Sequence, residues 1–145
     1  MGAKLNLQEI KTFVLLGFGK TTISTAKFLL QNFPDAKIKI SELKEKEVFD
    51  LSQISEIENQ KVEFEFGKQT KEFVFEKDCF IVISPGIPPR VELIQEIFNS
   101  EIPYGTDLDL FAASLSKEQN YVTITGTNGK TTTTSLLAHI FNSPS

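Results

Sequence analysis

The 145-residue sequence contains no tryptophan, one methionine, one histidine and one cysteine. Because Cys79 is alone, it cannot form an internal disulfide or a cysteine metal cluster, which fits a reducing compartment. The sequence has no run of about 18 apolar residues, and its amino terminus lacks the basic and then apolar pattern of a signal peptide. We therefore expect a cytoplasmic protein with no membrane partner.

The sequence also lacks a basic excess, since 15 Lys and Arg stand against 19 Asp and Glu for a net charge of -4. A groove that follows a nucleic-acid backbone needs such an excess, so we expect no nucleic-acid partner. Hydrophobic residues make up 40% of the chain and charged residues 23%, which are ordinary values for a globular protein. These values disfavour disorder, collagen and coiled coil.

Strand-like and helix-like segments alternate along the chain. The apolar run from Lys11 to Leu16 ends in glycines, and helical spacing follows it. The same alternation continues through expected strands at residues 38–42, 62–66, 80–83 and 102–104. We predict an α/β fold with a Rossmann-like parallel sheet and helices on both faces. A linker and the first βα unit of a truncated second domain are expected to follow it.

Several local predictions are specific enough to test. A weak amphipathic helix is expected within residues 44–59, and residues 70–77 are ambiguous. Val91, Ile94 and Phe98 indicate one further helix. Asp107 is expected to cap another, whose inner face would hold Leu108, Phe111 and Leu115.

The first glycine loop, Gly17 to Thr22, lies between an expected strand and an expected helix. It is an incomplete dinucleotide fingerprint, because Thr22 stands at the third glycine position, where it would crowd the helix against the strand. Lys20 and the two threonines suit a phosphate at a helix start, but a plain tight turn explains the glycines equally well. Glu42, at the end of the next strand, is either an acceptor for a ribose or base edge or a solvated turn residue.

The second glycine loop, Gly126 to Thr132, is the more specific motif. It follows a β-branched run and precedes helical apolar spacing, which is the context that a phosphate-binding loop requires. It departs from the strict pattern, because Ile124 replaces the first glycine. Lys130 would meet the terminal phosphates of a nucleotide, and Thr131 would be a ligand for Mg²⁺.

Four motifs together resemble the Mur ligases, and within them the D-glutamate-adding ligases. The segment Gly126–Thr132 resembles the ATP loop of this family. Gly17–Gly19, Ser84–Pro88 and Thr106–Phe111 resemble the amino-terminal half of the D-glutamate-adding members. Asn128 stands where the alanine-adding ligases typically have histidine.

The resemblance implies an enzyme that adds D-glutamate to UDP-N-acetylmuramoyl-L-alanine through an acyl phosphate in peptidoglycan synthesis, a step that serves cell-wall formation, cell shape and division. It implies that residues 1–115 bind the UDP-precursor and that residues 116–145 form a linker and the start of an ATP-binding ligase domain. The implied substrate contacts are Gly19, Lys20, Thr21, Thr22, Glu42, Leu43, Ser84, Pro85 and Gly86. The implied ATP contacts are Gly126, Thr127, Asn128, Gly129, Lys130, Thr131 and Thr132.

Within this set the resemblance gives Lys130 and Thr131 catalytic roles, the second through Mg²⁺. The family's other magnesium ligands would lie beyond Ser145, so we expect no ligase turnover from this chain alone. The apolar stripe of the last helix would then lack cover, so we expect the helix to fold back on the first domain, to pair with another copy in self-association, or to fray.

Two other functions remain open from the residues alone. A small dinucleotide-binding oxidoreductase or sensor domain would use the first glycine loop. A free-standing P-loop ATPase would use the second, although no second magnesium acid follows Thr131. His139 and Cys79 are interpreted as packing or surface residues.

Overall fold

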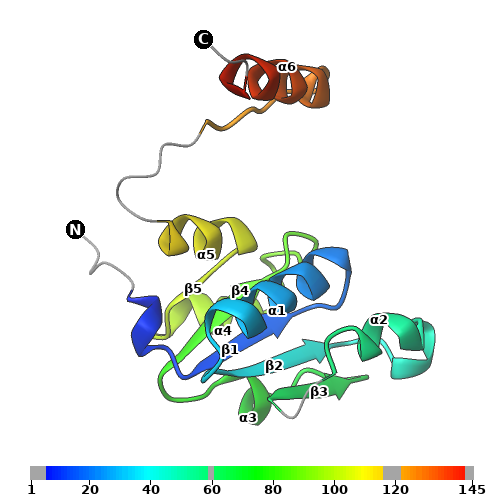
Figure 1. Cartoon of the computed structure of the whole chain (residues 1–145). Helices are drawn as coiled ribbons and strands as arrows, with labels where there is room; N and C mark the ends of the chain where they lie inside the picture. Colours follow the sequence, from blue (N-terminus) through cyan, green and yellow to red (C-terminus); the bar gives the residue numbers. More distant parts are fainter. Residues whose placement is uncertain (1–5, 59–60, 116–121, 143–145) are drawn as a thin grey trace. The chain divides into compact units, whose positions relative to one another are not determined.

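A computed structural model describes residues 6–58, 61–115 and 122–142 of the chain. The contacts divide the chain into two compact units, Met1–Leu115 and Ser116–Ser145. The first unit is an α/β structure, and the described part of the second contains the helix α6 (Lys130–Asn142) (Figure 1).

Five parallel strands form the sheet of the first unit. They run in the order β3-β2-β1-β4-β5, with every neighbouring pair parallel. The chain moves outward from β1 in one direction and returns to place β4 on the other side, so the strand order reverses between β1 and β4. This arrangement confirms the predicted Rossmann-like fold. The strands are β1 (Thr12–Leu16), β2 (Lys37–Glu42), β3 (Val62–Phe66), β4 (Cys79–Ile83) and β5 (Tyr104–Gly105).

Helices cover both faces of the sheet (Figure 1). One apolar core holds side chains of α1, α2 and α5 against one face, and a second core holds side chains of α3 and α4 against the other. The helices are α1 (Lys20–Asn32), α2 (Leu51–Ser55), α3 (Lys71–Val74), α4 (Glu92–Asn99) and α5 (Asp107–Ser114), with 3-10 turns η1 (Leu7–Glu9) and η2 (Lys46–Val48).

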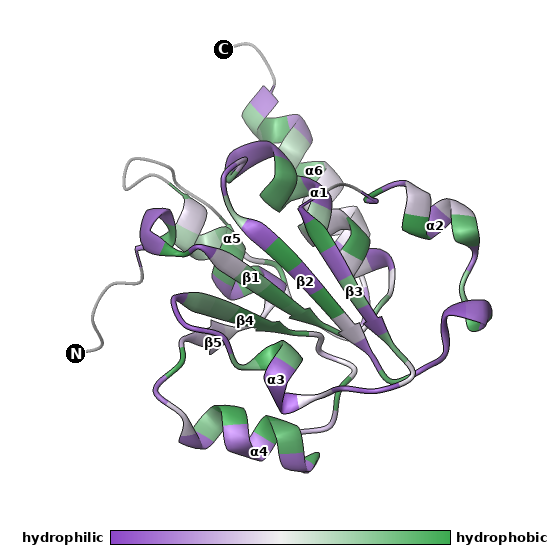
Figure 2. Ribbon diagram, turned by 90° about the horizontal axis from the view of Figure 1, so that it is seen from below, coloured by the Kyte–Doolittle hydropathy of each residue, from purple (hydrophilic) through white to green (hydrophobic). Residues whose placement is uncertain are grey.

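The central strands differ from the outer strands in hydropathy. Every residue of β1 and β4 is buried, and Figure 2 shows both strands as largely apolar, whereas β2 and β3 alternate between apolar and polar residues. A parallel strand covered by helices on both faces excludes water from both sets of side chains, so both sets are apolar. Cys79 begins β4 and is 1% exposed. Burial raises the pKa of its thiol.

The buried lysine of β2 is paired with a carboxylate from the segment between α3 and β4. Lys39 is 7% exposed, and its ammonium donates to the Glu76 carboxylate at 2.8 Å. The same ammonium lies 4.6 Å from the centre of the Phe73 ring, and the Thr12 hydroxyl also donates to Glu76. A buried charge is tolerated when it is paired in this way.

A second polar cluster lies at the carboxyl ends of β2 and β3. The buried carboxylate of Glu65 accepts from the Ser41 hydroxyl at 2.8 Å and from the Thr70 hydroxyl at 2.6 Å. It also accepts from the Thr70 backbone N–H at 2.9 Å. The Gln69 amide donates to the Ser41 carbonyl. This network fastens the segment after β3 to the end of β2.

Several local predictions were wrong in detail. The expected helix within residues 44–59 consists of η2 and the short α2, because Asp50 caps a new helix start by accepting from the Ser52 N–H. Leu93, Ile94 and Ile97 form the buried face of α4, whereas Phe98 is exposed.

The cap and inner face of α5 also differ from the prediction. The N-cap is Thr106 rather than Asp107, since Thr106 and Asp109 form a capping box. Leu110 is the buried residue, while Leu108 and Phe111 are exposed. The eight-residue helix carries apolar side chains on two sides, so its sequence alone does not select the side that meets the sheet.

The strand expected before the second glycine loop is not formed among the described residues, since residues 122–126 have no strand conformation. Tyr121 lies outside the described residues. A β-branched run becomes a strand only with a sheet neighbour, and the described part of this unit offers none.

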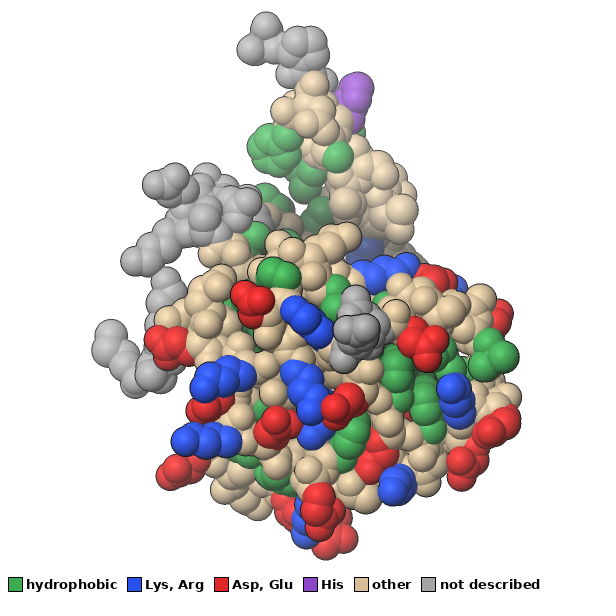
Figure 3. All heavy atoms as spheres, turned by 60° about the horizontal axis from the view of Figure 1, so that its bottom comes forward, with side chains coloured by type: hydrophobic (Ala, Val, Ile, Leu, Met, Phe, Trp, Pro, Cys, Tyr) green, Lys and Arg blue, Asp and Glu red, His purple; other side chains and the backbone are tan. Residues whose placement is uncertain are grey.

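Charged side chains of both signs are interspersed on the face shown in Figure 3. No helix within the described residues is long and apolar enough to cross a membrane.

The Lys39 and Glu76 pair predicts a dependence of stability on pH. The hydrogen bond from Lys39 lowers the pKa of Glu76 below its ordinary value. A carboxyl with a lowered folded-state pKa stabilises the fold above its unfolded pKa and loses that contribution as the pH falls through the folded value. We expect the urea midpoint of the wild type to fall between about pH 5 and pH 3. The Glu76→Gln variant should lose less over this interval, and an equal loss in both proteins would contradict the assignment.

Candidate functional site

The candidate site lies where the carboxyl ends of β1 and β4 meet at the reversal of strand order. Gly17 follows β1 with a φ of 89°, and its N–H donates to the Ser41 carbonyl at 2.8 Å. Ser84 follows β4 and donates its N–H to the Leu16 carbonyl at 3.2 Å. A Cβ atom on Gly17 would stand 3.0 Å from the Ser84 Oγ, so only glycine allows this approach at this backbone conformation. Ligands of such sheets bind at this reversal.

The start of α1 has no side-chain cap. Gly19 is the N-cap, with no side-chain cap hydrogen bond and no acidic residue in the first turn. The first N–H groups of a helix have no partner within it, and the helix dipole favours negative charge there. Lys20 and Thr21 are exposed at this end. An ammonium, a hydroxyl and backbone N–H groups therefore lie together at the helix start.

Glu42 holds the first glycine loop. One oxygen of its carboxylate accepts from the Phe18 N–H at 2.7 Å, and the other accepts from the Lys44 N–H at 2.9 Å. The carboxylate that was predicted to accept from a ribose or base is thus already bonded to the loop backbone. Its neighbour Leu43 is 59% exposed and offers an apolar surface beside the loop.

The side chain of Phe18 also holds the first glycine loop in place. Its ring is buried, and the centres of the Phe49 and Phe66 rings lie 4.9 and 5.7 Å away in edge-on geometry. Phe64 lies 6.4 Å away. Edge-on aromatic pairs stabilise by about 1 kcal/mol each beyond their buried area. The loop is therefore fixed by aromatic packing and by the Glu42 carboxylate together.

Thr22 occupies the third glycine position and is 4% exposed. Its hydroxyl donates to the Gly17 carbonyl at 2.9 Å, and its Oγ1 lies 3.4 Å from the Ser84 Oγ. The threonine therefore fits between the helix and the strand, where its hydroxyl forms a hydrogen bond with the loop backbone.

The loop after β4 borders a hollow of about 300 Å³. Ser84 is half-buried, and Pro85 and Gly86 are exposed. Apolar side chains make up much of the wall, and the two residues of the α5 capping box also line it. The hydrogen bond from the Thr106 N–H lowers the pKa of Asp109. The wall consists of Ile83, Ser84, Pro85, Ile87, Pro89, Ile94, Phe98, Tyr104, Gly105, Thr106 and Asp109.

The sequence analysis did not identify Thr106 and Asp109 as a hydrogen-bonded pair that lines this hollow. Their spacing of three residues before an apolar segment is the signal of a capping box and could have identified them.

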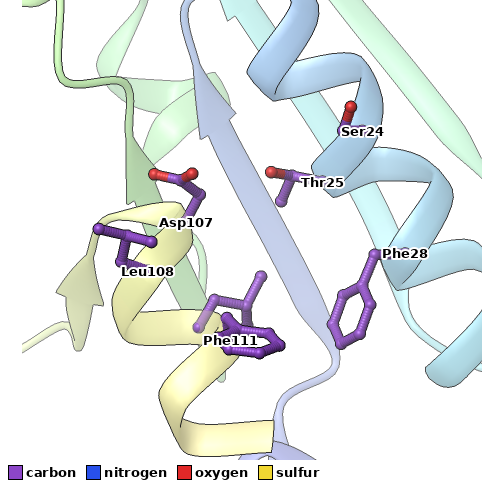
Figure 4. Close-up of a pocket in the computed structure, with 7 residues that line it drawn as sticks. Ser24, Thr25, Phe28, Asp107, Leu108 and Phe111 are labelled. Atoms are coloured by element: carbon purple, nitrogen blue, oxygen red, sulfur yellow. The ribbon is translucent and has the colours of Figure 1, made fainter. Parts of the chain in front are cut away.

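An apolar groove of about 270 Å³ lies between α1 and α5 (Figure 4). Phe28 on α1 and Phe111 on α5 point toward one another across it, and Asp107 and Thr25 line its upper end. Leu108 and Phe111, which were expected to face the sheet, line this groove instead.

The second glycine loop has two glycines at positive φ directly before a helix. Gly126 has a φ of 151° and Gly129 a φ of 78°, and α6 begins directly after them. The Lys130 ammonium donates to the Gly126 carbonyl. The whole segment Gly126–Thr132, with Thr127, Asn128 and Thr131, is exposed. Within the described residues, no three or more His, Cys, Asp or Glu form a group that could hold a metal ion.

The approach of Ser84 to Gly17 predicts the effect of adding one methyl group. Gly17→Ala should lower the free energy of unfolding by about 1 to 2 kcal/mol, because an L side chain is strained at positive φ, and the contact with Ser84 adds to this loss. Gly86→Ala is the matched control, since a Cβ there meets nothing within 4 Å. Its effect should stay within about 0.5 kcal/mol. Equal urea midpoints for the two variants would contradict the geometry.

Comparison with known proteins places this domain in a family. The family described as "Mur ligase MurD-like, N-terminal domain" matches residues 11–105. The UDP-N-acetylmuramoylalanine--D-glutamate ligase of Thermotoga maritima is 35% identical over 128 residues, which cover 88% of this chain and 28% of that protein. The ligase of the same name from Thermoanaerobacter sp. strain X514 is 37% identical over 132 residues, covering 90% of this chain and 28% of its own length.

The same-named protein of Rickettsia prowazekii is 48% identical over a shorter stretch of 63 residues, or 43% of this chain and 14% of that protein. The chain spans about 28% of the length of the first relatives it matches. The family match covers the sheet from the residue before β1 to the end of β5, and with it the loops Gly17–Thr22 and Ser84–Gly86. We call the space that these two loops border the crevice. The chain therefore belongs to the MurD-like Mur ligases and contains their amino-terminal domain.

Proposed function

We propose that this chain is the amino-terminal part of an ATP-dependent ligase that joins D-glutamate to UDP-N-acetylmuramoyl-L-alanine in peptidoglycan synthesis. In this proposal the unit Met1–Leu115 binds the UDP-precursor, and the unit Ser116–Ser145 is a linker and the start of the ATP-binding domain. The names of the relatives support the reaction class, and the geometry of the first unit supports the binding role.

The observation that carries the binding role is the uncapped start of α1 at the reversal of strand order. A diphosphate carries the negative charge that this helix end attracts, and it fits beside Gly19, Lys20 and Thr21. β2 and β4 lie on opposite sides of β1, so a ligand held at the centre can extend in two directions. We place the uridine toward Leu43 at the end of β2, and the sugar and peptide toward Ser84, Pro85 and Gly86.

The second glycine loop fits the phosphates of ATP. Its left-handed glycine at Gly129, the helix start and the exposed Lys130 are the parts that a phosphate-binding turn needs. Lys130 would stabilise charge on the transferred phosphoryl group, and the Thr131 hydroxyl would be one ligand of Mg²⁺. Transfer to the substrate carboxylate gives the acyl phosphate that the amine of D-glutamate attacks.

The bonding of Glu42 bears on the alternative of a dinucleotide-binding oxidoreductase or sensor. In dinucleotide sites the acid at the end of the second strand accepts from a ribose hydroxyl. Here both oxygens of that acid are bonded to backbone N–H groups. A carboxylate oxygen has two lone pairs, so each oxygen of Glu42 keeps one for a ribose hydroxyl of either nucleotide, and a titration with both ligands separates the two functions.

Calorimetric titration of the 145-residue chain tests the binding role. We expect saturable binding of UDP-N-acetylmuramoyl-L-alanine and no saturable binding of NAD. Lys20→Ala should weaken binding of the precursor about 10- to 100-fold, because a charged hydrogen bond to phosphate contributes about 1.5 to 3 kcal/mol. Lys27→Ala, two turns along the same helix, is the control and should bind as the wild type does. Binding of NAD without any response to the precursor would favour the alternative.

The proposed division of labour predicts the activity of the chain by itself. Because it spans about 28% of its relatives' length, we expect it to show no ligase turnover. A coupled assay of phosphate release with ATP, Mg²⁺, D-glutamate and the UDP-precursor measures this. Ligase-level rates would contradict the expectation, and Mg²⁺-dependent ATP hydrolysis without the other substrates would favour the free-standing ATPase.

A further inference from the structure

Thr22 is the residue of the first glycine loop that departs from the glycine pattern, and its hydroxyl connects the two loops of the crevice. It donates its single proton to the Gly17 carbonyl at 2.9 Å. Its oxygen also lies 3.4 Å from the Ser84 Oγ. The contact spans 62 residues of sequence and joins the start of α1 to the end of β4.

The proton count of this pair fixes its direction. A hydroxyl has one proton to donate and two lone pairs that accept. Because the proton of Thr22 is used on Gly17, the bond between the two hydroxyls requires Ser84 to be the donor. The chain of hydrogen bonds therefore runs from Ser84 to Thr22 to the Gly17 carbonyl.

Burial of Thr22 protects its bond to the Gly17 carbonyl, which is the shorter of its two contacts. Thr22 is 4% exposed, so water has little access to replace this bond, and its proton stays on Gly17. The absence of a Cβ at Gly17 brings Ser84 close enough to take part. Ser84 itself is half-buried and lines two hollows, one beside Thr21 and Thr22 and the other beside Thr106.

We infer that Thr22 is a positioning residue that sets Ser84 as a hydrogen-bond acceptor, so that this side of the crevice selects a ligand group that donates a proton. The inference rests on the proposed binding of the UDP-precursor. A phosphate oxygen only accepts, so the lone pairs of Ser84 do not suit it, and the anion is left to the start of α1. A sugar hydroxyl or an amide N–H is the donor that fits. Thr22 thereby acts on the sugar and peptide portion of the substrate and not on its diphosphate.

Titrations with two probes, UDP and UDP-N-acetylmuramoyl-L-alanine, separate these portions. Thr22→Val keeps the volume and removes the hydroxyl. We expect it to weaken binding of the precursor about 3- to 10-fold, the effect of one hydrogen bond, and to change binding of UDP less than about twofold. Thr22→Ser should restore binding of the precursor. Thr12→Val, at the opposite end of β1 and also buried, is the matched control and should leave the ratio of the two affinities unchanged.

The role through Ser84 is tested by a double-mutant cycle. Ser84→Ala should weaken binding of the precursor by a similar factor, and adding Thr22→Val to it should cause no further loss. Equal weakening of both probes by Thr22→Val, additive losses in the double variant, or no loss at all would each overturn the inference.

The wild type, the two single variants and the double variant also distinguish this inference from the proposed function. The cycle is repeated on urea unfolding without ligand, where we expect the two substitutions to be non-additive by at least about twofold in the unfolding constant. A wild type that binds neither probe but shows this coupling would contradict the proposed function and leave the link between the loops intact. Additive unfolding effects would overturn the link itself, whatever the titrations show.

Discussion

The crevice of the first unit depends on one missing atom, the Cβ of Gly17. Without it, the backbone turns at positive φ directly after β1, and the Ser84 side chain packs against that turn. The same turn sends the chain into α1 with its first N–H groups open and brings Thr22 under the Gly17 carbonyl. The proposed anion site and the proposed donor-selecting side thus both depend on a single backbone conformation.

Polar residues of β2 and β3 stabilise this backbone conformation through hydrogen bonds. The Ser41 carbonyl accepts from the Gly17 N–H, and the Ser41 hydroxyl donates to the buried Glu65 carboxylate. Glu65 in turn holds Thr70, so the end of β2, the segment after β3 and the glycine turn share one network. Buried polar groups are retained where every member is bonded, and within the described residues no buried side-chain N or O atom lacks a hydrogen-bond partner. Polar residues that appear misplaced in two strands therefore position the site.

The fold and the place of the site could be predicted from the sequence because their signals are local. The apolar run of β4 and the strand, glycine and helix order around Gly17 each lie within about 20 residues. The bonds that define the site are not local, since Glu42 reaches Phe18 across 24 residues and Thr22 reaches Ser84 across 62. A sequence shows that an acid or a threonine is present but not which backbone group it meets. The strand expected before the second glycine loop failed for a related reason, because a strand needs a neighbour that the local sequence does not contain.

Cys79 has a practical consequence for the study of this fold. It is the single cysteine of the sequence, and its side chain lies in the apolar core between the central strands and α4. Its register partner is Thr12 at the start of β1. Alkylating reagents react with the thiolate, so burial and the raised pKa protect this thiol in the folded state. The rate at which a reagent modifies the native chain therefore measures how often the middle of the sheet opens, and the protein carries this probe without any substitution.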